Sequence, residues 1–521
     1  MNISQAKDYI KNSINIYLKK DEFGDYRIPV VRQRPIFLLG APGIGKTAIM
    51  EQIAEELGVA LVSYSMTHHT RQSAIGLPFI KQKSYDGMSY DVSEYTMSEI
   101  IASVYDTMEA SGVKEGILFL DEINCVSETL APSMLQFLQY KVFGKHRVPE
   151  GWVIVTAGNP PEYNKSVREF DVVTLDRLKV LNVEADYKTW REYALDKGVH
   201  GAVLNFLELK KEYFYHMETT VNGRHYVTAR GWEDLSEIIY MYEEDGLAVD
   251  ESLIGQYIRS DNIVREFAAY YDLYNKYKND YKADEILSGN ITELALTRAK
   301  QAGFDERLSL LGMLLDKVQA ELKDVILQSD YLTELMTPLK VCKQENDYEA
   351  MIGMLKVQAE ARDKIIENKE RANSLSKTEK LMHKRVKRFL EERYKEIVSG
   401  GVSGLPDISG SSNTTEVVFK YIKSRFDAEV DAMKQEVATV SKMLHNLFDF
   451  TSKAFEDGNE MLILVTELTV SKYSSRFISM FGSEDYHRYN QLLMISERQQ
   501  EMKSNISKLD LGSVGTDITK L

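Results

Sequence analysis

Cysteine is nearly absent from this chain of 521 residues, which contains only Cys125 and Cys342, far apart in the sequence. Two isolated cysteines exclude a disulfide framework and a metal site built from cysteine pairs, and they fit a reducing cytoplasm. Long apolar runs are also missing. The nearest candidate, Met461–Val465, is far shorter than the roughly 18 residues of a membrane-spanning helix. The first residues lack the basic-then-apolar order of a signal peptide, so we expect a soluble cytoplasmic protein that contacts no membrane.

Positive charge is in short supply. The chain has 64 Lys and Arg residues against 79 Asp and Glu residues, a formal net charge of −15. Because binding nucleic-acid phosphates needs basic surface, this balance argues against a nucleic-acid motor as the first interpretation. Hydrophobic residues make up 44% of the chain, enough for a substantial core. The length indicates roughly two to four domains.

One glycine-rich segment carries the strongest chemical signal. Residues 40–47 read G-A-P-G-I-G-K-T, the G-x-x-x-x-G-K-T pattern of a phosphate-binding P-loop. The apolar run at 35–39 predicts a buried strand before it, and helical spacing of apolar residues predicts a helix after it. In that setting Lys46 would reach the β- and γ-phosphates of a nucleotide, and the Thr47 hydroxyl would bind Mg²⁺. The predicted nucleotide-binding residues of the loop are Gly40, Ala41, Pro42, Gly43, Ile44, Gly45, Lys46 and Thr47.

Polar side chains follow two further predicted strands. The run at 116–120 leads into Asp121 and Glu122, and the run at 153–157 leads towards Asn159. Ligands bind at the carboxyl edge of open parallel sheets, so these groups would lie beside the P-loop. Asp121 would hold Mg²⁺, Glu122 would orient and polarise the attacking water, and Asn159 would hydrogen-bond the γ-phosphate or that water. Taken alone, the acids could be solvated loop residues, and Asn-Pro is only a turn signal.

Two arginines have two interpretations each. Arg177 follows Asp176, which is usual for a surface ion pair, but it could instead reach a phosphate held by a neighbouring subunit. Arg230 begins a predicted helix, where the helix dipole disfavours a cation. Either a bound phosphate or the nearby Glu233 and Asp234 would remove that conflict.

The remaining pattern predicts an α/β protein with three parts. Residues 1–183 form a P-loop core with a parallel sheet, 184–279 form a helical lid, and 280–521 form an all-α region. We expect two hairpins in the core, at 79–90 with an Asp-Gly turn and at 142–146.

Long helices are predicted in the all-α region at 293–328, 348–399 (split near Ser374), 460–481 and 483–509, with a flexible Gly/Ser-rich loop at 399–415. Between the loop and the last two helices, apolar residues alternate in steps of four and three, which suits coiled-coil packing within a bundle or with a partner. These seam residues are Phe426, Val430, Met433, Val437, Val440, Leu444 and Leu447.

The motifs GAPGIGKT, LFLDEIN, VIVTAGNP, LDRL and TARGW, in this order, resemble those of the AAA+ ATPases, and more narrowly of the MoxR-like ATPases, over roughly residues 30–240. The resemblance implies an AAA+ fold with Walker A at 40–47, Walker B at Asp121 and Glu122, and sensor 1 at Asn159. It also implies an arginine finger at Arg177 and a phosphate-contacting sensor 2 at Arg230.

The same resemblance implies that both hairpins face the pore of a ring. A second interface arginine could be Arg168, although an ion pair with Glu169 or Asp171 is at least as good an interpretation.

We therefore expect a ring-forming ATPase, a hexamer that binds ATP and Mg²⁺ between subunits and converts ATP and water to ADP and phosphate. The resemblance implies a chaperone-like role in remodelling or activating a client protein, often together with a von Willebrand factor A domain protein. The alternatives are a nucleic-acid-dependent AAA+ motor, which the net charge disfavours, and a nucleotide-gated scaffold whose coiled-coil region is the working part.

Overall fold

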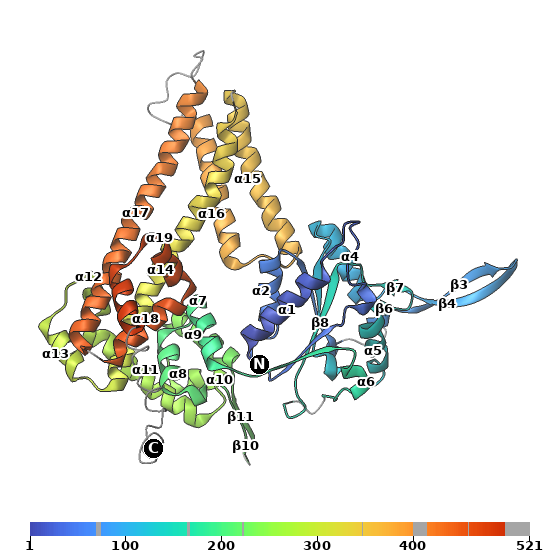
Figure 1. Ribbon diagram of the computed structural model, residues 1–521, viewed down its shortest axis with the longest axis horizontal. Helices are drawn as coiled ribbons and strands as arrows, with labels where there is room; N and C mark the ends of the chain where they lie inside the picture. Colours follow the sequence, from blue (N-terminus) through green and yellow to red (C-terminus); the bar gives the residue numbers. More distant parts are fainter. Residues whose placement is uncertain are drawn as a thin grey trace, which may run out of the picture.

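The computed structural model describes residues 1–68, 74–163, 167–220, 223–345, 347–399, 414–456 and 458–494. An α/β unit lies at the right of Figure 1 and a mostly helical region at the left, and long helices rise to a shared apex at the top. No helix within these ranges combines the length and the apolar character needed to cross a bilayer.

A parallel sheet forms the centre of the α/β unit. Its strands, in spatial order, are β2 (Ala60–Ser65), β5 (Gly116–Asp121), β8 (Trp152–Gly158), β1 (Ile36–Gly40) and β9 (Lys179–Val183). Every pair is parallel, so the carboxyl ends of all five strands lie at one edge. The runs of apolar residues in β1, β5 and β8 are nearly all buried, as strands covered on both faces require. The predicted α/β class with a parallel sheet is confirmed.

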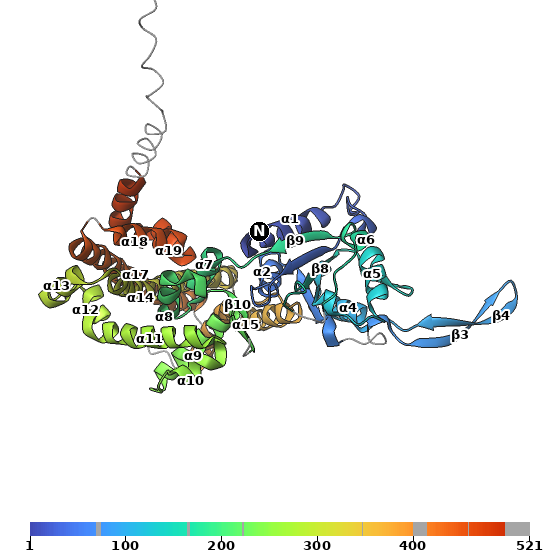
Figure 2. The same cartoon turned by 90° about the horizontal axis from the view of Figure 1, so that it is seen from below.

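Helices cover both faces of the sheet (Figure 2). They are α1 (Ile3–Tyr17), α2 (Ala48–Leu57), α4 (Glu99–Ser111), α5 (Ala131–Tyr140) and α6 (Val172–Leu175). Successive strand residues point to opposite faces. Accordingly, Ile117 and Phe119 of β5 pack with the apolar residues of α1 and α2, whereas Leu118 and Leu120 pack with those of α4 and α5.

Two hairpins extend from the core as predicted. The first pairs β3 (Pro78–Tyr85) with β4 (Met88–Tyr95) and projects well beyond the sheet (Figures 1 and 2). Its turn has positive φ at Asp86 and Gly87, the conformation that favours Asp-Gly in two-residue hairpins. The second pairs β6 (Val142–Phe143) with β7 (His146–Arg147). The carboxylate of Glu94 joins the hairpins by ion pairs with Lys83 and Lys145.

The segment predicted as the lid, called the lid below, follows β9 and contains one element that the sequence pattern did not predict. Its last helix ends at Tyr281, past the predicted boundary at 279. Its helices are α7 (Tyr187–Lys197), α8 (Gly201–Leu209), α9 (Ala229–Glu244), α10 (Glu251–Tyr257) and α11 (Asp261–Tyr281). Between α8 and α9 lies an antiparallel hairpin of β10 (His216–Thr220) and β11 (Gly223–Val227), where we expected helices alone. The Asn222-Gly223 dipeptide was the missed signal, because Asn-Gly favours hairpin turns.

Single 3₁₀ turns occur throughout the first half of the chain. They are η1 (Val30–Arg32), η2 (Met66–His68), η3 (Ile123–Cys125) and η4 (Lys211–Tyr213). A short turn precedes α5, which begins at Ala131. The Leu130 amide bonds to the Ser127 carbonyl in a preceding turn, and Pro132 occupies the first turn of α5, where proline is tolerated.

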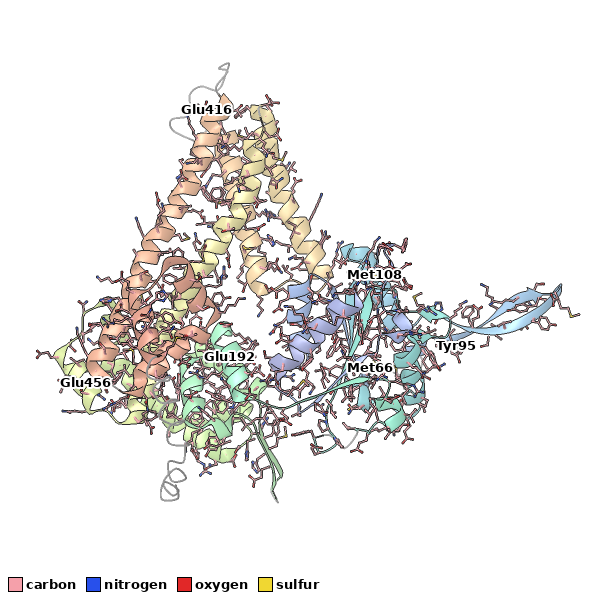
Figure 3. The ribbon with its side chains drawn as sticks, viewed as in Figure 1. Met66, Tyr95, Met108, Glu192, Glu416 and Glu456 are labelled. Atoms are coloured by element: carbon pink, nitrogen blue, oxygen red, sulfur yellow. The ribbon has the colours of Figure 1, made fainter. Side chains whose placement is uncertain are left out.

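The C-terminal region is entirely helical where it is described. It contains α12 (Ala283–Ser288), α13 (Glu293–Gln301), α14 (Phe304–Lys343), α15 (Tyr348–Arg371), α16 (Lys377–Val398), α17 (Thr414–Phe455), α18 (Asn459–Val470) and α19 (Lys472–Phe481). Figure 3 shows the reach of α17, with Glu416 near the apex and Glu456 at the opposite end of the helical region.

Most of the predicted helices are present with different ends. The helix expected at 293–328 is α13 followed by α14, and the pair expected at 348–399 is α15 and α16, split near Ser374. The helix expected at 460–481 is interrupted at Ser471, whose side chain caps α19. Residues 484–494 are helical, but the rest of the helix predicted at 483–509 and most of the loop predicted at 399–415 lie outside the described residues. The seam residues of α17 pack against two hydrophobic clusters within this chain.

Candidate nucleotide site

The P-loop connects β1 to α2, as predicted. Gly43 and Gly45 have φ values of 73° and 92°, in the left-handed region that glycine adopts without strain. The side chain of Lys46 folds back over the loop, and its ammonium donates hydrogen bonds to the carbonyls of Gly40 and Ala41, at 2.7 Å each. A third bond of 2.9 Å reaches the side-chain oxygen of Asn159 at the end of β8.

The Lys46 ammonium is buried, and burial lowers its pKa. The side chain is only 8% exposed, and its three acceptors are neutral oxygens. Burial lowers its pKa to about 8; Asp121 and Glu122 raise that pKa, and Arg230 lowers it further. A buried ammonium held only by neutral oxygens would gain more from an anion such as phosphate.

Two oxygen donors meet at the carboxyl end of β5. The Thr47 hydroxyl donates to Oδ2 of Asp121 at 3.0 Å, and the other Asp121 oxygen accepts the backbone N–H of Glu122 at 2.9 Å. A hydroxyl and a carboxylate are the hard oxygen ligands that Mg²⁺ prefers, usually with phosphate and water completing its shell. The residues present therefore fit Mg²⁺, and Thr47 and Asp121 are the two that would hold it.

Glu122 is held by residues that the sequence reasoning missed. Its Oε2 atom accepts hydrogen bonds from the hydroxyls of Ser65 and Thr67, at 3.0 Å each. Glu122 itself has a φ of 55°, an uncommon value for a residue other than glycine. Ser65 ends β2 and Thr67 lies in the following turn, so the signal was available: β2 also ends in hydroxyl residues at the carboxyl edge of the sheet.

Asn159 is fixed in place by Asn124, another residue that the sequence reasoning missed. The Asn124 amide donates to the Asn159 backbone carbonyl at 2.8 Å. Its side chain packs so closely on Gly158 that a Cβ there would lie 2.4 Å from Oδ1 of Asn124. The end of β8 is therefore held in one position, with the Asn159 amide beside Lys46.

Two residues of the lid contact the P-loop. A Cβ on Gly43 would lie 2.9 Å from the Cβ of Thr228, the residue that caps α9. The Tyr215 hydroxyl donates to the Pro42 carbonyl at 3.1 Å. Arg230 is exposed in the first turn of α9, and its charge acts on Lys46. The structure thus brings Arg230 to the same site as the P-loop.

The other two arginines point elsewhere. Arg177 is exposed, and its guanidinium donates to the Val173 carbonyl in its own turn at 3.0 Å. Arg168 forms an ion pair with Glu128. The predicted ion pair of Arg168 with Glu169 or Asp171 is therefore wrong. Asp171 instead caps α6 by accepting a hydrogen bond from the Thr174 amide.

Comparison with known proteins identifies the α/β unit. Residues 36–174 match the family model "ATPase family associated with various cellular activities (AAA)". A search of curated proteins found no match. Among solved structures, the crystal structure of NtrX from Brucella abortus is similar at 16% identity, over 39% of this chain and 45% of that chain, with a TM-score of 0.22. This chain thus spans less than half of that protein. With its P-loop and its parallel sheet, the stretch from 36 to 174 is an AAA ATPase domain.

Proposed function

We propose that this protein is a ring-forming AAA+ ATPase of the MoxR-like type that remodels or activates a client protein. One observation carries the proposal: the Lys46 ammonium, the Thr47–Asp121 oxygen pair and the Asn159 amide converge at the carboxyl edge of one parallel sheet. These groups come from three strands, and together they would bind a nucleotide triphosphate with its metal.

Each residue has a role in converting ATP and water to ADP and phosphate. Lys46 would exchange its carbonyl partners for the β- and γ-phosphates. When held by Thr47 and Asp121, Mg²⁺ would neutralise charge that develops on the phosphates. Glu122 would leave the Ser65 and Thr67 hydroxyls to orient and polarise the attacking water. Asn159 would hydrogen-bond that water or the γ-phosphate, and Arg230 would contact phosphate from the lid.

A ring would complete the site with Arg177 of a neighbouring subunit. Within the described residues of one chain, Arg177 is exposed, its guanidinium donates to the Val173 carbonyl, and its charge acts on Asp171, the residue that caps α6. An exposed guanidinium of this kind could also reach a second copy. Val172 and Val173 beside it are 81% and 59% exposed, and apolar residues in such a position fit a contact between copies. We propose a hexamer, following the MoxR-like resemblance.

The hairpins are the proposed contact with the client. Tyr85, Met88 and Tyr90 lie near the tip of the β3–β4 hairpin and are each at least half exposed. In a ring of the proposed type these side chains would face the pore. A partner with a von Willebrand factor A domain is part of the same proposal, and it rests on the family resemblance alone.

Steady-state ATPase assays with Mg²⁺ test the catalytic assignment. We expect Lys46→Ala to abolish ATP binding and turnover, and Glu122→Gln to bind ATP while losing a factor of roughly 10² to 10⁴ in kcat. Lys114→Ala and Glu109→Gln replace exposed residues of the same types on the same domain and should behave like the unaltered protein. Full activity of Lys46→Ala would contradict the proposal.

Two further measurements test assembly and client. Sedimentation with ATP and Mg²⁺ should show a particle with the mass of a hexamer. A monomer that hydrolyses ATP at full rate would contradict the proposed assembly. Glu122→Gln with ATP, purified from its native cells, should retain the client.

A further inference from the structure

Helix α15 runs from the apex down to α4, as Figure 1 shows. The turn between α15 and α16 therefore lies at the edge of the central sheet. There the Leu61 amide of β2 donates to the Ala372 carbonyl at 2.8 Å, and the Asn373 side-chain amide donates to the Leu61 carbonyl at 3.1 Å. Since β2 is an edge strand, the outward groups of Leu61 need partners from outside the sheet. The α15–α16 pair, called the arm below, supplies them.

The contact is buried and well defined. Ala372 is 1% exposed and belongs to the hydrophobic cluster on the α4 face of the sheet. Arg371 donates to the Ala110 carbonyl near the end of α4, at 3.3 Å. Asn373 has a φ of 50°, in the left-handed region that Asn tolerates better than most residues. That backbone turn ends α15 and directs the amide to Leu61.

The same strand ends at Ser65, which contacts the predicted catalytic glutamate. Leu61 and Ser65 are four residues apart on β2, about 13 Å at the usual rise of a strand. Ser65 and the adjacent Thr67 are the two residues whose hydroxyls hold Glu122. The arm therefore holds one end of a short strand whose other end holds the carboxylate.

The middle of the arm is fixed to α14 in the helical region. Arg362 of α15 is 5% exposed and forms an ion pair with Glu334 of α14, and Arg385 of α16 bonds to Gln328 of the same helix. Helix α14 in turn contacts the lid, where Lys323 donates to the Asp196 carbonyl at 3.0 Å. A displacement of the lid or of a bound client would reach β2 through these packed helices.

We propose that Asn373 is a positioning residue and that the docked arm acts as a brake on hydrolysis. In the docked state β2 keeps Ser65 and Thr67 on Glu122, which occupies the carboxylate with hydroxyls rather than with the attacking water. A load on the arm that lifts Asn373 from Leu61 frees the strand end and releases Glu122. This inference rests on the proposed ATPase function.

The variant Asn373→Asp tests the brake. Asp has the same shape and tolerates the same backbone, but it places a carboxylate oxygen against the Leu61 carbonyl, so two acceptors oppose each other. The matched control is Asn368→Asp, an exposed position in the last turn of α15 with the same change of charge. Asn373→Gly provides a milder variant, since it removes the amide and keeps the left-handed turn.

Two readouts are measured on the full-length protein: hydrogen exchange at the Leu61 amide and steady-state ATPase kinetics. We expect Asn373→Asp to accelerate exchange at Leu61 and to raise kcat about tenfold with KM for ATP unchanged, in line with the loss of a hydrogen bond. Asn373→Gly should do the same to a smaller degree, and Asn368→Asp should change neither. In a Ser65→Ala, Thr67→Val background, Asn373→Asp should have no further effect on kcat.

Three results would overturn the inference. Unchanged exchange at Leu61 in Asn373→Asp would remove the role of Asn373. Faster exchange with an unchanged or lower kcat would show that the docked arm is no brake. Absence of any turnover in the unaltered protein would overturn the proposed function as well, which separates that failure from the first two.

Discussion

Thr228 of the lid lies so close to Gly43 of the P-loop that a Cβ on the glycine would come within 2.9 Å of the threonine Cβ. The Tyr215 hydroxyl, also in the lid, bonds to Pro42 one residue earlier. The conformation of the loop and the position of the lid are therefore linked. A shift of α9 would move the loop. Binding of a phosphate in the loop would in turn displace the first turn of α9, where Arg230 lies.

Replacing Gly43 tests this link. Gly43→Ala adds a methyl group against Thr228 at a residue with a φ of 73°, where a side chain costs about 1–2 kcal/mol. We expect at least about tenfold weaker ATP binding, measured with a fluorescent nucleotide, because the cost and the clash both fall on the loop. The control is Gly246→Ala in the lid, with a φ of 66° and no atom within 4 Å of the added Cβ. Equal ATP affinity of the two variants would contradict the link.

The pH dependence of ATP binding should report Lys46. Its pKa of about 8 in the free site is below the usual value because of burial, and a bound phosphate would raise it again. Below about pH 8 the ammonium is charged both before and after binding, so affinity should not change with pH. Above about pH 8 binding must take up a proton, so the dissociation constant should rise by up to about tenfold per pH unit.

Calorimetry in buffers with different ionisation enthalpies measures the proton uptake directly. Uptake should be near zero at about pH 7 and approach one proton at about pH 9. A dissociation constant that stays constant between these values would show that Lys46 does not exchange its carbonyl partners for phosphate.

The chemistry of the site was readable in the sequence because it is encoded locally. The P-loop is contiguous, and Asp121 and Asn159 each follow an apolar run that can only be a buried strand. Parallel pairing then places those strand ends at one edge, so their proximity follows from the fold class. Such reasoning needs no knowledge of which strands are neighbours.

What the sequence did not reveal depends on tertiary neighbours. The hydroxyls of Ser65 and Thr67 reach Glu122 because β2 pairs with β5, and the order of strands is not written in either segment. Arg168 pairs with Glu128 rather than with its sequence neighbours. The bond from Leu61 to Ala372 joins residues that share no local pattern.

The interface between the lid and the C-terminal region contains a carboxyl group whose protonation should set stability. Oδ2 of Asp316 in α14 is inaccessible and accepts no hydrogen bond within the described residues. Burial raises the pKa of Asp316 to about 7; Arg191 lowers it, and Glu467 raises it. The unfolded chain releases this proton near pH 4, whereas the folded chain keeps it until about pH 7. Stability should therefore fall as pH rises from about 4 to about 7.

Asp316→Asn should remove this pH dependence. At about 1.4 kcal/mol per pH unit, the variant would gain up to about 4 kcal/mol at about pH 8 and almost nothing at about pH 4. Thermal melting across this range measures the difference. The control is Asp324→Asn, an exposed carboxylate on the same helix, which should leave the curve unchanged. Equal melting temperatures for Asp316→Asn and the unaltered protein at about pH 8 would contradict the assignment.

Arg177 should act on the nucleotide of a neighbouring copy. We expect Arg177→Ala to lose a factor of about 10³ in kcat with ATP affinity nearly unchanged, because the guanidinium would stabilise charge that is largest in the transition state. Arg265→Ala serves as the control, since that exposed arginine also donates to a carbonyl one turn earlier, that of Asp261. Steady-state assays of the separate variants give the first comparison.

Mixing two inactive variants distinguishes action between copies from action within one. In a mixed ring, an Arg177→Ala subunit keeps its own Glu122 and receives an intact Arg177 from a Glu122→Gln neighbour, so that site is complete. Equal amounts of the two variants should therefore hydrolyse ATP faster than either variant alone. If the mixture is no faster than the average of its components, Arg177 acts within its own chain or not at all, and the shared site is wrong.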